Sequence, residues 1–99
     1  MPRAIILIDH GSRRESANAV LESVADLVRE RGLRTEPDLI VRVAHMELAE
    51  PTLAEAIASA VAAGAREIVI HPYFLATGRH VTEDIPRLAE EARAAHPNV

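Results

Sequence analysis

The sequence predicts an α/β fold in which a parallel β-sheet is flanked by helices. Three short aliphatic segments, 4–8, 39–44 and 66–70, have the β-branched composition of strands buried in such a sheet. Each is followed by a segment whose apolar residues recur with the i, i+3, i+4, i+7 spacing of an amphipathic helix. Because alternating strands and helices imply parallel pairing with right-handed crossovers, we expect the order β-α-β-α-β-α in one domain over residues 1–99.

Composition excludes several classes of function. The chain has no cysteine, which rules out a disulfide framework and a thiolate metal site. Its net charge of −4 argues against non-specific nucleic-acid binding, and Tyr73 and Phe74 are too few for a base-stacking platform. No stretch has the features of a signal peptide or the length of a membrane span. We therefore expect a cytoplasmic protein that binds neither membranes nor nucleic acid.

The first strand, 4–8, ends at the loop Asp9-His10-Gly11-Ser12. A helix is predicted over residues 13–31, with Ser12 and Glu15 as a capping box and Gly32 as its end. The apolar residues on its buried face are expected to be Ala17, Val20, Leu21, Val24, Leu27 and Val28.

The second strand carries Arg42 within an apolar run, which indicates an edge strand or a partly exposed face. In the helix that follows, Pro51 suits the first turn, and Thr52 with Glu55 forms an alternative capping box. The predicted apolar stripe of this helix is Leu53, Ala56, Ile57, Ala60 and Val61, and Gly64 closes it.

The third strand, 66–70, leads into the segment 71–80, which contains His71 and His80. Pro86 is expected within the first turn of a third helix, capped by Thr82 or Asp84. Its predicted apolar stripe is Ile85, Leu88, Ala89, Ala92 and Ala95. A fourth strand would be expected next but is absent, so we expect a short form whose sheet is truncated or completed by a partner.

The strand ends predict where chemistry takes place. In open α/β sheets, ligands bind beyond the carboxyl ends of the strands, where the strand order reverses. With a flavodoxin-like order (second, first, third), His10 and His80 would face one crevice, with Glu47 at its flank. Two imidazoles and a carboxylate suit Fe²⁺, Co²⁺ or Ni²⁺, and imidazoles also exchange protons near neutral pH. For each of His10, His80 and Glu47, the alternative is an ordinary loop residue with no part in binding.

Arginines flank both loops. The guanidinium groups of Arg13, Arg14 and Arg79 can pair with an anionic ligand, although ordinary surface ion pairs are the alternative. The remaining histidines have simpler interpretations. His71, beside a proline at the end of the third strand, is expected to be structural, and His45 and His96 to be surface or packing residues.

Three motifs together resemble a known family. These are His10-Gly11-Ser12-Arg13; Glu47 with Glu50-Pro51-Thr52-Leu53; and Phe74-Leu75-x-x-Gly78-x-His80-Val81-x-x-Asp84-Ile85-Pro86. They are similar to the small CbiX-type chelatases, the ATP-independent class II sirohydrochlorin cobaltochelatases and ferrochelatases. Two residues depart from the family's pattern: Asp9, where a small or apolar residue is common, and His71, where an aliphatic residue is usual.

The resemblance implies a three-layer chelatase-like fold, here without the usual last strand and helix. It implies ATP-independent insertion of Co²⁺ first, and Fe²⁺ second, into sirohydrochlorin on the route to cobalamin or sirohaem. His10 and His80 would hold the metal and accept pyrrole protons, with Glu47 as an acidic metal ligand. Ser12 and the flanking arginines would contact the carboxylate-rich tetrapyrrole. No cofactor is implied beyond the substrate metal, and the family's small members usually form homodimers.

Other functions remain open from the sequence. A metal carrier would use the same histidines without turnover. A phosphoryl-transfer enzyme would use His10 as its nucleophile, but those phosphatases carry an arginine where this chain has Asp9. A non-catalytic subunit is a further alternative, suggested by the early end of the chain.

Overall fold

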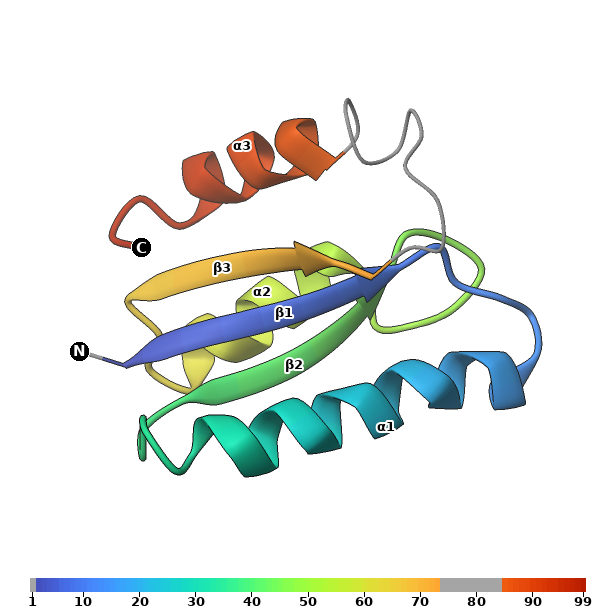
Figure 1. The fold of residues 1–99 in the computed structure, drawn as a ribbon. Coiled ribbons are helices and arrows are strands. Elements are labelled where there is room, and N and C mark those ends of the chain that lie inside the picture. The colour runs from blue at the N-terminus through green and yellow to red at the C-terminus, as the bar shows by residue number, and fades with distance from the viewer. Residues whose placement is uncertain (1, 74–84) are drawn as a thin grey trace.

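The computed structural model describes residues 2–73 and 85–99, and the predicted alternation of strands and helices is confirmed (Figure 1). All strand pairing is parallel, and the strand order is β2-β1-β3, as expected for the flavodoxin-like arrangement. The elements are β1 (Arg3–Asp9), α1 (Glu15–Gly32), β2 (Ile40–His45), α2 (Leu53–Ala62), β3 (Glu67–Pro72) and α3 (Ile85–Ala95).

The central strand β1 supplies both halves of the core. Because side chains alternate along a strand, Ile6 and Ile8 point to one face and Leu7 to the other. Ile6 and Ile8 pack with residues of α2 and α3, whereas Leu7 packs with Leu21 of α1. The sheet is therefore a middle layer, with α1 on one face and α2 and α3 on the other (Figure 1).

Helix α1 covers only part of its face of the sheet. It packs against β1 and β2, and its buried residues are Leu21 and Ala25. The prediction that Ala17, Val20 and Leu27 are buried was wrong, because all three are exposed. Val69, on the strand beyond β1, is exposed as well. Within residues 2–73 and 85–99, no helix covers this face of β3.

The outer edge of β2 is closed by two arginines. The backbone oxygen of Val41 accepts hydrogen bonds from Arg29 Nη2 at 3.0 Å and from Arg42 Nη1 at 3.1 Å. Arg42 Nε also donates to Ser59 Oγ at 2.9 Å, which ties the strand to α2. Such side chains keep an edge strand from pairing with another chain. The prediction that Arg42 marks an edge strand is confirmed.

The helix caps differ from the prediction in two places. The capping box of Thr52 with Glu55 is present, but Pro51 precedes the cap and does not lie in the first turn. At α1 the predicted capping box is absent: the N-cap residue is Arg14, whose side chain makes no cap hydrogen bond. Ser12 Oγ instead accepts from the backbone N–H of Arg14 at 3.1 Å.

The described helices include none that is both long enough and apolar enough to span a membrane.

Candidate active site

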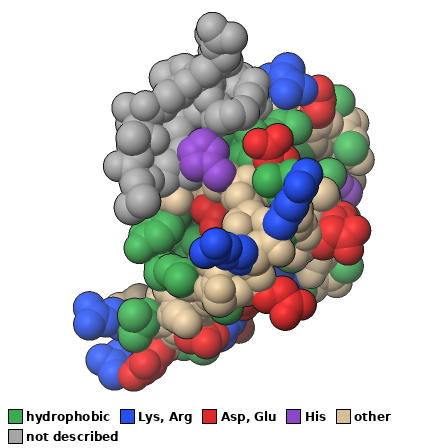
Figure 2. Space-filling view, turned by 90° about the vertical axis from the view of Figure 1, so that its right-hand side faces the viewer, with side chains coloured by type: hydrophobic (Ala, Val, Ile, Leu, Met, Phe, Trp, Pro, Cys, Tyr) green, Lys and Arg blue, Asp and Glu red, His purple; other side chains and the backbone are tan. Residues whose placement is uncertain are grey.

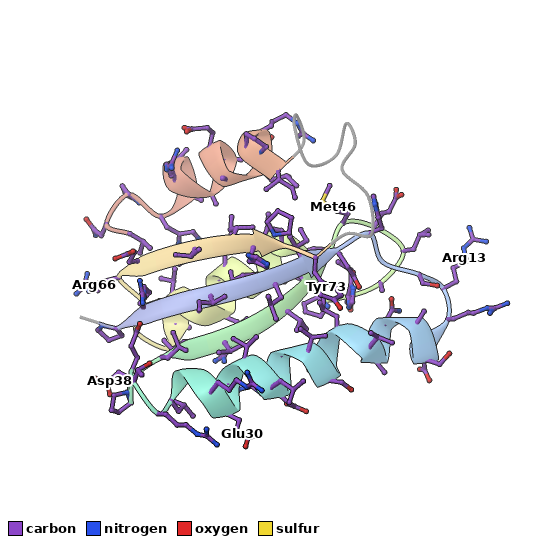
Figure 3. The ribbon with its side chains drawn as sticks, in the orientation of Figure 1. Arg13, Glu30, Asp38, Met46, Arg66 and Tyr73 are labelled. Atoms are coloured by element: carbon purple, nitrogen blue, oxygen red, sulfur yellow. The ribbon has the colours of Figure 1, made fainter. Side chains whose placement is uncertain are left out.

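The polar loops gather at the carboxyl end of the sheet, as the strand order predicts. Figure 2 looks onto this end, where arginine, carboxylate and histidine side chains share one face. Figure 3 shows Arg13, Met46 and Tyr73 at this end, and Asp38 and Arg66 at the opposite end. The candidate site is therefore assembled from segments that follow β1, β2 and β3.

Backbone hydrogen bonds continue from β1 to both neighbouring segments. The oxygen of Ile8 accepts from the N–H of Tyr73 at 2.7 Å on the β3 side. On the β2 side, the oxygen of Asp9 accepts from Met46 at 2.9 Å, and that of His10 accepts from Glu47 at 3.1 Å. His10 thus leaves the central strand between the two flanking segments, and its side chain is exposed.

The backbone turns at Gly11 immediately against the segment after β2. Gly11 has a φ of +86°, a conformation that glycine adopts without a steric penalty. A β-carbon at this position would lie 1.9 Å from the backbone oxygen of Glu47 and 3.1 Å from the β-carbon of His45. Only glycine therefore permits the close approach that brings His10 beside Glu47.

Ser12 and Asn18 hold the rest of this loop. The N–H of Ser12 donates to Asn18 Oδ1 at 2.9 Å, and Asn18 Nδ2 donates to the oxygen of Ser12 at 2.7 Å. This pair of hydrogen bonds replaces the predicted capping box as the connection between loop and helix. It leaves the exposed Arg13 and Arg14 between the loop and α1, with Arg13 extending outward in Figure 3.

Part of the predicted site lies beyond what the structure describes. His80 and Arg79 fall outside residues 2–73 and 85–99, as do the candidate caps Thr82 and Asp84. Pairing of His10 with His80 therefore stays a prediction. Glu47 is exposed on the loop after β2, joined to His10 through its backbone. Among the described residues, no group of three or more potential metal ligands converges.

His45 is a further candidate site residue, one that the sequence pattern did not indicate. The predicted strand ends at residue 44, but His45 is the last residue of β2 and only 3% of it is exposed. Its Nδ1 lies 2.5 Å from Oδ1 of Asp9, which is the last residue of β1. The two residues are register partners, so their side chains share a face of the sheet. Extending the second predicted strand by one residue would have revealed this pairing.

His71 and His96 lie elsewhere in the fold. His71 belongs to β3, which ends at Pro72, two residues beyond the predicted strand, and His71 is exposed on it. His96 follows α3 and donates its backbone N–H to the oxygen of Ala92 at 2.9 Å. Neither side chain is brought to His10 by the strand register.

Comparison with known proteins identifies the chain's relatives. It is 44% identical over 88 residues to the chloroplastic sirohydrochlorin ferrochelatase of Arabidopsis thaliana, covering 89% of this chain and 37% of that protein. It is 42% identical over 85 residues to the sirohydrochlorin cobaltochelatase of Methanocaldococcus jannaschii, covering 86% of this chain and 57% of that protein. The chain therefore spans well under two thirds of the length of these two relatives.

A solved structure supports the same relationship. The cobalt complex of the sirohydrochlorin chelatase SirB from Bacillus subtilis subspecies spizizenii matches with a TM-score of 0.86 and 27% identity. The match covers 100% of this chain and 41% of that one. Residues 4–99 also match the CbiX family. The β2-β1-β3 sheet and the His10-Gly11 turn against Glu47 agree with these matches. The chain therefore belongs to the CbiX family.

Proposed function

We propose that this chain inserts Co²⁺, with Fe²⁺ as the second candidate, into sirohydrochlorin. The observation that carries the proposal is the position of His10, which leaves the central strand at the point where the strand order reverses. Membership of the CbiX family supports the substrate, because relatives named for sirohydrochlorin chelation with cobalt or iron share 42–44% identity with the chain.

The reaction makes simple demands on the protein. The divalent cation loses water, the macrocycle loses two pyrrole N–H protons, and four nitrogens then bind the metal. His10 and His80 hold the cation on one side of the macrocycle, and an imidazole that is not bound to metal accepts a proton. Glu47, joined to His10 through a 3.1 Å backbone hydrogen bond, supplies a carboxylate for the metal or a proton.

The insertion proceeds without ATP. Its cost is desolvation and deprotonation, which metal ligands and proton acceptors can meet. The sequence contains no Gly-x-x-x-x-Gly-Lys-Ser/Thr phosphate loop, because none of its four glycines has another glycine five positions away.

Ser12, Arg13, Arg14 and Arg79 contact the carboxylates of the tetrapyrrole.

We also propose that the protein forms a homodimer through β3. The support is the difference between the two sheet edges. The outer edge of β2 is closed by Arg29 and Arg42, whereas within residues 2–73 and 85–99 no side chain bonds to the outer edge of β3. Val69, on β3 itself, is exposed. An open strand edge next to an exposed apolar side chain suits pairing with a second strand.

Metal competition tests the proposed function. Sirohydrochlorin would be incubated with the protein and equal Co²⁺, Fe²⁺ and Ni²⁺, and product formation followed by absorbance under anaerobic conditions. Catalytic insertion predicts many product molecules per protein, with cobalt favoured. Metal binding with no insertion above the uncatalysed rate, at any tetrapyrrole concentration, would favour the carrier and contradict the proposal.

A further inference from the structure

We infer that the Asp9–His45 hydrogen bond is a positioning element that fixes the backbone on which His10 and Glu47 are carried. The inference rests on the proposed function for its role in metal insertion. The first support is location. Asp9 and His45 are in-register end residues of adjacent strands, and they immediately precede the segments that carry His10 and Glu47.

The bond joins a buried ring to a partly exposed carboxylate. His45 Nδ1 lies 2.5 Å from Asp9 Oδ1, with side-chain exposures of 3% and 20%. An ionised carboxylate can only accept, so Nδ1 carries the hydrogen and donates it. Hydrogen bonds to a charged group are short and stronger than neutral ones, and a buried ring left without its partner is costly. The bond therefore constrains both strand ends together.

Around the bond, the backbone is tied at consecutive residues. The N–H groups of Met46 and Glu47 donate to the oxygens of Asp9 and His10. On its other side, the N–H of His45 donates to the oxygen of Pro51 at 2.9 Å, where the loop returns to α2. His45 thus anchors the 46–51 loop at both its start and its end. Gly11, which packs on Glu47 and His45, completes the contact.

His45 is unusual for its burial. Of the described residues, it is the one polar or charged residue that is buried. A core position filled by an imidazole rather than an aliphatic side chain implies a geometric requirement that packing alone does not supply. A displacement of about 1 Å at reacting groups can cost roughly 10²-fold in rate, so fixing this backbone is a direct contribution to insertion.

Two substitutions remove the bond and one keeps it. Asp9→Ala removes the acceptor, and His45→Phe keeps the ring's bulk but removes the donor. Asp9→Asn retains an oxygen acceptor for Nδ1–H, and its added amide can reach solvent because Asp9 is partly exposed. Ile57→Val, a small change in an α2 core cluster that includes neither Asp9 nor His45, is the control for stability loss.

Amide hydrogen exchange gives a test that needs no enzymatic activity. Asp9→Ala and His45→Phe should speed exchange at Met46 and Glu47 about tenfold, with little change at Val43 in mid-strand. Asp9→Asn should restore most of the protection, and Ile57→Val should not affect these two amides selectively. Unchanged exchange at Met46 and Glu47 in Asp9→Ala, or equally fast exchange in Asp9→Asn, would overturn the inference.

Kinetics provide the second arm. Asp9→Ala and His45→Phe should raise the KM for Co²⁺ about tenfold while changing the KM for sirohydrochlorin less. Because Asp9 and His45 act as a unit, the variant that combines Asp9→Ala with His45→Phe should have a KM for Co²⁺ no higher than that of the poorer single variant. Additive losses would overturn the inference. If the wild type shows no turnover, the proposed function fails while the exchange result still decides positioning. If the Asp9→Ala variant does not fold, the comparison of amide exchange between the His45→Phe and Asp9→Asn variants tests the inference in its place.

Discussion

A β-carbon on Gly11 would lie 1.9 Å from the backbone oxygen of Glu47, closer than any two unbonded heavy atoms can approach. This packing joins the loop after β1 to the loop after β2. It brings the backbone of a histidine and that of a carboxylate together although they are distant in the sequence. Their relative position therefore depends on the absence of a side chain at one residue.

Gly11→Ala should lower the free energy of unfolding by about 3 kcal/mol or displace the Glu47 loop, since it adds both steric overlap and an unfavourable φ. Urea denaturation would measure it. Gly64→Ala is the matched control, because Gly64 has a φ of +104° but nothing within 4 Å of an added β-carbon. It should cost only about 1–2 kcal/mol, the backbone penalty alone. Equal losses in the two variants would show that the Gly11–Glu47 contact is unimportant.

Arg13→Ala and Arg14→Ala should raise the KM for sirohydrochlorin a few-fold each and leave kcat little changed. Exposed ion pairs contribute about 0.2–1 kcal/mol each, which corresponds to at most about fivefold. The KM should also rise with ionic strength in the wild type and less steeply in the variants. Arg66→Ala, at the opposite end of the sheet in Figure 3, is the control. An equal effect at Arg66 would argue against a specific site for the tetrapyrrole carboxylates.

Val69→Lys should convert a homodimer into a monomer in sedimentation experiments, because a lysine on an open edge strand opposes pairing. Leu33→Lys is a close control, since Leu33 and Val69 are each 41% exposed but Leu33 lies at the end of α1. That variant should remain dimeric. A wild-type monomer, or a Val69→Lys dimer as tight as the control, would contradict the proposed dimer.

Thr52→Ala should lower the free energy of unfolding by about 1 kcal/mol by removing the α2 cap. Thr52 Oγ1 accepts from the N–H of Glu55 at 3.2 Å, and Glu55 Oε1 accepts from the N–H of Thr52 at 2.8 Å. Ser12→Ala is the comparison at α1, where Ser12 does not cap the helix. Thermal unfolding should show a clearly smaller loss for Ser12→Ala. Similar losses would mean that the Ser12 loop carries an equivalent cap.

The fold was largely predictable because strand composition and helical periodicity agreed along the whole chain. Arg42 was correctly interpreted as an edge residue, since a charge within an apolar strand needs solvent nearby. Periodicity could not say how much of an apolar stripe is covered. Leu27 and Val20 fit the helical pattern, but α1 packs over β1 and β2 and leaves that flank exposed.

Local competition explains the other errors. Ser12 has the spacing of a capping box, but Asn18 bonds to both backbone groups of Ser12 and the helix begins later. The predicted strand ended one residue before His45, because strand ends are uncertain by a residue or two from sequence. That single residue decides whether its ring is exposed or paired with Asp9. The position of His80 is not among the described residues, so the histidine pair rests on the strand order and the family motif.

The most direct measurement is the rate of cobalt insertion into sirohydrochlorin by the wild type and the His10→Ala and His71→Ala variants. His10 leaves the central strand at the site, whereas His71 is exposed within β3 and serves as the matched histidine control. We predict a loss of about 10²-fold or more for His10→Ala and little change for His71→Ala. A His10→Ala variant that inserts cobalt at the wild-type rate would contradict the assignment of this site.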